Sequence, residues 1–170
     1  MKTTSLSLLA LFLFGCAGVP ESIEPVTDFE LDRYEGKWYE IARLDHRFER
    51  GLEKVSATYS INDDGTVKVE NRGFSTKDEK WEDATGKAKF VGDKDVGHLK
   101  VSFFGPFYGS YIIFDLDKEH YQYSFVTSNE NYLWLLSRTP TVSDELKDQF
   151  ISVAKEAGYD TESLIFVNQE

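Results

Sequence analysis

Few residues in this sequence have the type and spacing needed for chemistry. The one cysteine, Cys16, excludes an intramolecular disulfide framework and any zinc site built on several cysteines. The three histidines, His46, His98 and His120, fall in different predicted segments and do not suggest a metal site. The Gly-x-Ser-x-Gly and His-Glu-x-x-His motifs and a phosphate-binding glycine loop are absent. The sequence therefore predicts no catalytic residue, no metal site and no cofactor.

The cysteine is the best candidate for a covalent modification. Lys2 and the apolar run Leu6–Phe14 are typical of a signal peptide, and the run is shorter than the roughly 20 residues that span a bilayer. Leu13-Phe14-Gly15-Cys16 resembles a bacterial lipobox, in which cleavage precedes an acylated cysteine. The alternative is an ordinary signal peptide cut nearby, with Cys16 a free thiol. We predict a lipoprotein signal peptide over 1–15, an acylated tether over 16–27 and a folded domain over 28–170.

The net charge and the composition of the chain limit the classes of partner that it can bind. Nineteen Lys and Arg residues against 30 Asp and Glu residues give a net charge of −11, which argues against nucleic acid as a partner. An anionic lipid surface would also repel such a chain, so stable membrane attachment requires covalent acyl chains. Aromatic residues make up 15% of the sequence, enough to dominate a core or a binding surface.

The elements that must position these residues are mostly strands. Alternating apolar and polar residues, broken by turn signals, predict a sandwich or barrel. Apolar spacing of three and four from Val142 to Ala157 predicts one helix, capped by Thr141 or Ser143. Leu164 to Val167 is expected to pair with the sheet edge. The eight predicted strands are 37–45, 54–61, 66–73, 81–91, 98–104, 109–116, 120–127 and 132–138.

Two short motifs point to a family. Gly36-Lys37-Trp38-Tyr39 opens the first strand, and Ser137-Arg138-Thr139-Pro140 ends the eighth. In this order they resemble the lipocalin motifs, and 115–121 falls where the family's middle motif lies. The stretches 38–55, 99–111 and 132–145 resemble the bacterial outer-membrane lipocalin lipoproteins of the Blc type, relatives of apolipoprotein D. The resemblance implies an all-β fold: an eight-stranded antiparallel up-and-down β-barrel of the lipocalin/calycin kind with one C-terminal α-helix.

Topology assigns these motifs a structural role. The start of the first strand and the end of the eighth lie at the same rim of an up-and-down barrel, so Trp38 and Arg138 can form a cation–π contact beside Gly36. By resemblance, this is the closed end of the barrel.

The opposite rim and the lumen are then the predicted binding site. The apolar parity also places Val69 and Phe125 on the lumen wall, and Arg47 or Arg50 could hold a carboxylate or phosphate head group. The predicted cavity and mouth residues are Phe48, Phe74, Phe90, Val101, Phe103, Phe107, Tyr123 and Trp134. Aromatic residues at the mouth could instead contact a second copy of the chain in a homodimer, contact the membrane surface, or fold inward as core.

The expected function follows from the apolar lumen and the anchor. We expect a fatty acid or lysophospholipid ligand, because an aromatic and aliphatic lining suits an acyl chain. The resemblance implies attachment to the outer membrane on its periplasmic side and a role in lipid storage or transport under stress. The alternatives are an interaction module that uses the mouth aromatics and an enzyme on a calycin scaffold.

Overall fold

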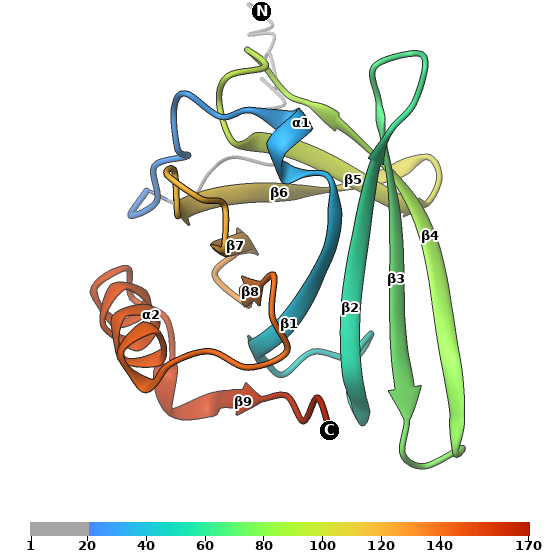
Figure 1. Ribbon diagram of the computed structural model, residues 1–170, viewed down its shortest axis with the longest axis vertical. Coiled ribbons are helices and arrows are strands. Elements are labelled where there is room, and N and C mark those ends of the chain that lie inside the picture. Colours follow the sequence, from blue (N-terminus) through green and yellow to red (C-terminus); the bar gives the residue numbers. More distant parts are fainter. Residues whose placement is uncertain (1–20) are drawn as a thin grey trace, which may run out of the picture.

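The computed structural model describes residues 21–170, which form a closed antiparallel barrel (Figure 1). Strands adjacent in the sequence pair with each other, and β1 closes the barrel by pairing with both β8 and β2. The predicted fold class is therefore confirmed. The strands are β1 (Gly36–Leu44), β2 (Leu52–Ile61), β3 (Val67–Ser75), β4 (Lys80–Phe90), β5 (His98–Phe104), β6 (Phe107–Leu116), β7 (Tyr123–Asn129) and β8 (Tyr132–Ser137).

Most strand limits lie within two residues of the prediction, and β7 differs most. It begins at Tyr123 rather than at 120, because the preceding residues form a hydrogen-bonded turn. The Tyr121 amide donates to the Asp117 carbonyl (2.8 Å), and the Asp117 carboxylate accepts from the His120 and Gln122 amides. This local side-chain bonding competes successfully with strand pairing.

Two apolar cores lie on opposite sides of the sheet. The interior core fills the barrel and includes Trp38, Tyr59, Val69 and Val126. The outer core lies between the barrel wall and the helix α2 (Asp144–Glu156). Phe150 of this helix is fully buried in that outer core. The helix therefore gives one part of the sheet a second buried face (Figure 1).

The helix and the last strand were both predicted. The Ser143 side chain accepts from the Leu146 amide and caps α2, as one of the two predicted caps. After a 3-10 turn at Thr161–Ser163, β9 (Leu164–Phe166) pairs with the second half of β1. The strand β1 pairs with β2 only from Gly36 to Tyr39. Beyond Tyr39, β9 pairs with the edge of β1 that β2 no longer covers.

The C-terminal residues close this seam between β1 and β2. The Gln169 side-chain amide donates to the main-chain oxygens of Glu40 (2.7 Å) and Val55 (2.9 Å). The Lys54 amide donates to the Asn168 carbonyl at 2.7 Å. At the other end of the barrel, the short helix α1 (Leu31–Tyr34) covers the interior (Figure 1).

The first described residues are docked on the barrel, which corrects the prediction of an extended tether as far as residue 27. Ile23 is buried in the outer core, and the Ser22 hydroxyl donates to the Ala157 carbonyl at 2.8 Å. The Val26 amide donates to the Ile113 carbonyl at 2.9 Å. The predicted signal peptide over 1–15 and Cys16 lie outside the described residues. Between residues 21 and 170, no helix has the length and apolar character to cross a membrane.

Candidate ligand-binding site

The closed end of the barrel is built around the predicted pair of motif residues. The Arg138 guanidinium lies 4.0 Å from the centre of the Trp38 ring, and the indole nitrogen donates to the Tyr34 carbonyl at 2.8 Å. Arg138 also donates to the carbonyl groups of Arg33 (2.8 Å) and Lys37 (3.1 Å). These contacts join α1 and β1 to the residue that follows β8.

Gly36 is required where it stands. Its φ of +93° lies in the left-handed region that strains other residues, and a Cβ atom would lie 3.3 Å from Nη1 of Arg138. A larger residue would therefore disturb the contact between Arg138 and the first strand.

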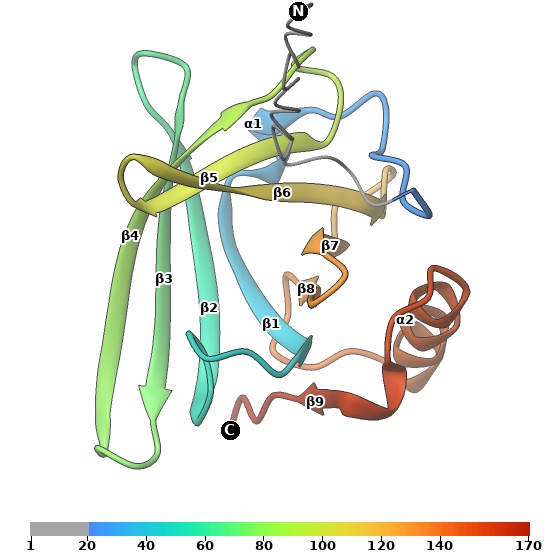
Figure 2. The same ribbon diagram turned by 180° about the vertical axis from the view of Figure 1, so that it is seen from behind.

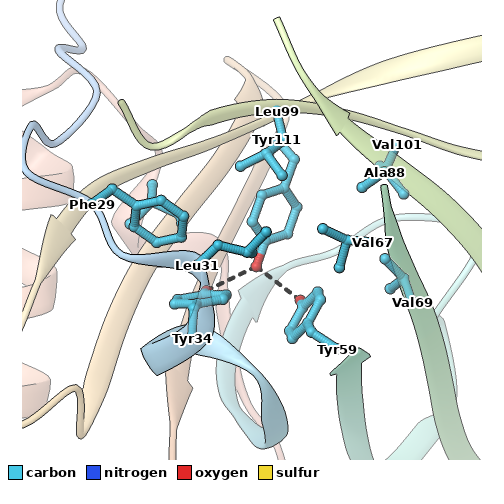
Figure 3. A pocket seen from close by; sticks show the side chains of 11 residues that line it. Phe29, Leu31, Tyr34, Tyr59, Val67, Val69, Ala88, Leu99, Val101 and Tyr111 are labelled. Carbon is cyan, nitrogen blue, oxygen red and sulfur yellow. Dashed lines mark hydrogen bonds between the residues drawn. The ribbon is translucent and has the colours of Figure 1, made fainter. Parts of the chain in front are cut away.

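Two buried tyrosines, Tyr34 and Tyr59, and the partly buried Tyr111 meet across the lumen just inside the closed end (Figure 3). The Tyr111 hydroxyl lies 2.9 Å from that of Tyr34 and 2.8 Å from that of Tyr59, and Tyr34 donates to Ser124 at 3.0 Å. Burial raises the pKa of Tyr34 to about 12 and the pKa values of Tyr59 and Tyr111 well above normal. All three phenols are therefore neutral at physiological pH, and we call them the tyrosine crossbar.

The lumen beside the tyrosine crossbar is nearly full. A cavity of about 10 Å³ remains there, on the scale of one water molecule. Its lining is apolar apart from the crossbar hydroxyls, and Val67, Leu99 and Val101 contribute to it. An acyl chain that reaches this depth must displace side chains.

The lower lumen, toward the open end, contains a buried ionic group that the sequence reasoning missed. Arg43 donates to the Glu40 carboxylate (2.7 Å) and to the Glu49 carbonyl (2.8 Å). The Glu49 carboxylate accepts from the Trp134 indole (3.1 Å) and lies 2.8 Å from Nε2 of His46. These contacts hold the loop between β1 and β2 against the lumen, and we call Glu40, Arg43, His46 and Glu49 the ionic cluster.

The two carboxyl groups of the ionic cluster titrate differently. Burial, and after it the charge of Glu49, raises the pKa of Glu40 well above its usual value, although Arg43 opposes the shift. Burial also acts on Glu49, but hydrogen bonding and charge from His46 overcome it and lower the pKa of Glu49. The pKa values of the two carboxyl groups therefore shift in opposite directions, and Glu40 takes up a proton more readily than Glu49.

The open end has a cavity of about 490 Å³. The Arg50 guanidinium is paired with Asp45 at 2.6 Å, whereas no carboxylate of the described chain lies within ion-pair distance of Arg47 or Lys77. The cavity therefore offers two cations without an ion-pair partner among the described residues, and the Arg47 guanidinium lies 4.7 Å from the centre of the Phe48 ring. Its lining residues are Arg47, Phe48, Arg50, Gly51, Leu52, Ser75, Lys77, Asp78 and Glu82.

Several predicted site residues do lie on the barrel interior. Phe90, Val101, Phe103 and Trp134 pack against the interior core. Phe103 occupies the space over Gly86, where an added Cβ would meet its ring at 2.8 Å. All four thus face the interior core, with Phe90 beside Phe29 near the closed end, Trp134 beside Glu49 in the lower lumen, and Phe48 separate from them at the mouth.

Tyr123 and Phe125 do not line the lumen, and the prediction that they do is wrong. Both pack in the outer core beneath α2, where the Phe125 ring lies 5.0 Å from that of Phe150. The Tyr123 hydroxyl accepts from the Gln149 side chain at 3.3 Å. The apolar parity misled because α2 covers the outer face of β7 and makes it the more apolar one, whereas the inner face carries the buried Ser124 beside Val126.

Phe74, near the end of β3, and Phe107, at the turn between β5 and β6, line neither cavity, which corrects their placement at the mouth. Phe74 packs edge-on against Trp81, 5.5 Å between ring centres, and Arg72 lies over the same indole. Phe107 is 79% exposed at the turn between β5 and β6.

The tyrosine crossbar and the ionic cluster had no signal in the sequence. Glu40 and Arg43 share the inner side of β1 only because the pairing with β8 shifts register between Glu40 and Ala42. Strict alternation would place them on opposite sides. Within residues 21–170, no group of three or more potential ligands is placed to hold a metal ion.

Comparison with known proteins gives a consistent result. Residues 29–169 match the family described as Lipocalin-like domain. The chain is 56% identical to the outer membrane lipoprotein Blc of Vibrio cholerae serotype O1, over 100% of both chains. It is 49% identical to the protein of that name from Escherichia coli K12, over 88% of this chain and 85% of the relative. Insecticyanin from the tobacco hornworm superposes with a TM-score of 0.70 at 21% identity, covering 89% of this chain and 86% of that one, which is a likeness of fold.

Proposed function

The chain belongs to the lipocalin family, and from this premise we propose that it is a lipid-anchored outer-membrane protein that binds a fatty acid or a lysophospholipid. The attachment to the outer membrane follows the names of the relatives from Vibrio cholerae and Escherichia coli. Acylation of Cys16 follows from the lipobox resemblance.

The observation that carries the ligand proposal is the mouth cavity with its two unpaired cations. Arg47 and Lys77 would hold a carboxylate or phosphate head group by charge-assisted hydrogen bonds. The acyl chain would enter the lumen past Trp134 and Phe103, toward the tyrosine crossbar. Burial of its methylene groups supplies about 0.8 kcal/mol each.

This function is reversible binding, with no bond made or broken. The protein would shield an acyl chain from water and release it at a membrane, as storage or transport of lipid requires. A periplasmic location and a role in membrane maintenance under stress follow from the family resemblance and complete the proposal.

A titration tests the ligand. The full chain, purified with its native processing and held in phosphatidylcholine nanodiscs, is titrated with palmitate, a palmitoyl lysophospholipid and hexadecanol while Trp fluorescence is followed. Palmitate and the lysophospholipid, which offer an anionic carboxylate and an anionic phosphate group, should bind about tenfold or more tightly than the uncharged alcohol, since one lost charge-assisted contact is worth about 1.5–3 kcal/mol. Arg47→Gln with Lys77→Gln should remove the difference, and Lys94→Gln with Lys155→Gln serves as the control. No response to any of the three lipids would overturn the proposal.

The anchor is tested separately. Wild-type cells should incorporate labelled palmitate into the protein, and Cys16→Ser should lose the label and leave the outer-membrane fraction. Retention of the label by the Cys16→Ser variant would contradict the acylation.

A further inference from the structure

The turn between β5 and β6 presents two aromatic rings to solvent. Phe104 is 72% exposed and Phe107 is 79% exposed, the largest values among the exposed large apolar residues of the described chain. With Gly105 and Pro106 between them, they form a surface that we call the aromatic tip. In both views the tip lies beside β4, apart from the turn between β3 and β4 at the open end (Figures 1 and 2). Neither cavity uses it, so the proposed ligand does not explain its exposure.

Two lysines lie close to the aromatic tip of this acidic protein. No Asp or Glu occurs from His98 to Phe114, although the chain has a net charge of −11. The ammonium groups of Lys89 and Lys100 lie 5.0 and 5.4 Å from the ring centre of Tyr108, the residue that follows the tip. Exposed aromatic rings beside lysines match the acyl boundary and the phosphates of a lipid leaflet.

The N-terminal segment attaches to the other end of the same hairpin. The Gly97 amide donates to the Val26 carbonyl (2.8 Å), and the Val26 amide donates to the Ile113 carbonyl (2.9 Å). Ser22 is already docked, so the chain from Cys16 to Ser22 spans at most about 20 Å. An acylated Cys16 would therefore hold the outer side of the β5–β6 hairpin close to the membrane.

We propose that the aromatic tip inserts into the leaflet that carries the anchor, with Lys89 and Lys100 on the lipid phosphates. The inference rests on the proposed acylation of Cys16 and adds a second, non-covalent contact. Two contacts at opposite ends of one hairpin orient the barrel, whereas an acyl anchor alone leaves it free to turn. A barrel oriented in this way would keep its mouth at a constant distance from the lipids it exchanges.

The experiment labels the tip in the anchored protein. Cys16 is the chain's only cysteine, so acylation leaves an introduced Phe107→Cys thiol as the single site for an environment-sensitive fluorophore. The matched control is Phe166→Cys on β9, which is also an exposed phenylalanine. Both proteins are reconstituted in phosphatidylcholine vesicles with and without phosphatidylglycerol. Quenching by a spin-labelled lipid and by aqueous iodide is then compared.

Lipid quenching and iodide protection at position 107, but not at 166, is the expected result. It should strengthen with phosphatidylglycerol and weaken in Lys89→Glu with Lys100→Glu. Protection that disappears when protein is diluted at constant lipid would assign the tip to a second copy and overturn the proposal. Iodide access at both positions on vesicle-bound protein would also overturn it, while leaving the anchor intact. Release of the chain from the vesicles would overturn the anchor, and the tip with it.

Discussion

Two arginines at opposite ends of the barrel show how differently the ends are built. Arg138 at the closed end donates to the main-chain carbonyl groups of Arg33, Lys37 and Tyr121 and lies over an indole. Arg43 in the lower lumen donates to a carboxylate and to loop carbonyl groups, and its Nε has no partner in the described chain. The closed end thus depends on main-chain geometry, whereas the open end depends on side chains that change charge.

The difference indicates which end can respond to its surroundings. Main-chain carbonyl groups do not titrate, so the contacts of Arg138 persist across the physiological pH range. The ionic cluster holds the loop between β1 and β2, and that loop supplies Arg47 and Phe48 to the mouth cavity. The loop that supplies these residues is therefore linked to the ionic cluster, and the closed end provides the constant frame.

Removal of the closed-end indole should have the largest effect. Trp38→Ala empties a fully buried site and leaves the Arg138 guanidinium without its aromatic partner. We expect the free energy of unfolding, measured in urea, to fall by about 3–5 kcal/mol. Arg138→Lys keeps the positive charge but loses the planar guanidinium donors, and it should lower the free energy of unfolding by less than Trp38→Ala does. A loss below about 1 kcal/mol for Trp38→Ala would contradict the assignment of this end as the frame.

The tyrosine crossbar should give an intermediate effect. Tyr111→Phe removes the hydroxyl that bridges Tyr34 and Tyr59 and leaves both with one partner fewer. The expected cost in unfolding free energy is about 1–3 kcal/mol, because buried polar groups lose a hydrogen bond. Tyr108→Phe, at an exposed ring, is the control and should be neutral within the error of the measurement. Equal losses of unfolding free energy in the two variants would show that the hydrogen bonds of the tyrosine crossbar do not stabilise the barrel interior.

The smallest expected effect is a pH dependence that arises at the open end. Because the folded pKa of Glu40 is raised, its contribution to stability is complete below the ordinary glutamate range and is lost as pH rises through the raised value. The slope is at most about 1.4 kcal/mol per pH unit for one proton. Glu40→Gln, which stays neutral, should flatten this slope in urea unfolding as the pH rises from the ordinary glutamate range through the raised pKa. If the free energy of unfolding changed with pH in the same way in the variant and the wild type, a group other than Glu40 would be responsible for the pH dependence.

The lowered pKa of Glu49 works in the opposite sense. Its contribution is present above the ordinary glutamate range and is lost as pH falls through the lowered value. Both contributions are therefore present in full only near the ordinary glutamate range.

Local pattern predicted the elements well but not the faces of every strand. Alternation in β3 and β5 placed Val69, Val101 and Phe103 correctly, because the outer faces of those strands meet water. The same reasoning failed for Tyr123 and Phe125, since the helix α2 covers the outer face of β7. An apolar residue indicates burial, but the sequence does not say on which side of a two-sided wall.

By itself, the sequence determined the barrel, the closed-end motif and the candidate anchor, because each depends on residues close together or on a strand order that is up and down. Only the tertiary structure decided the tyrosine crossbar, the ionic cluster and the position of the aromatic tip. The crossbar joins α1, β2 and β6, and the ionic cluster depends on a register shift in β1. A one-residue shift exchanges the two faces of a strand, and no local pattern in this chain records it.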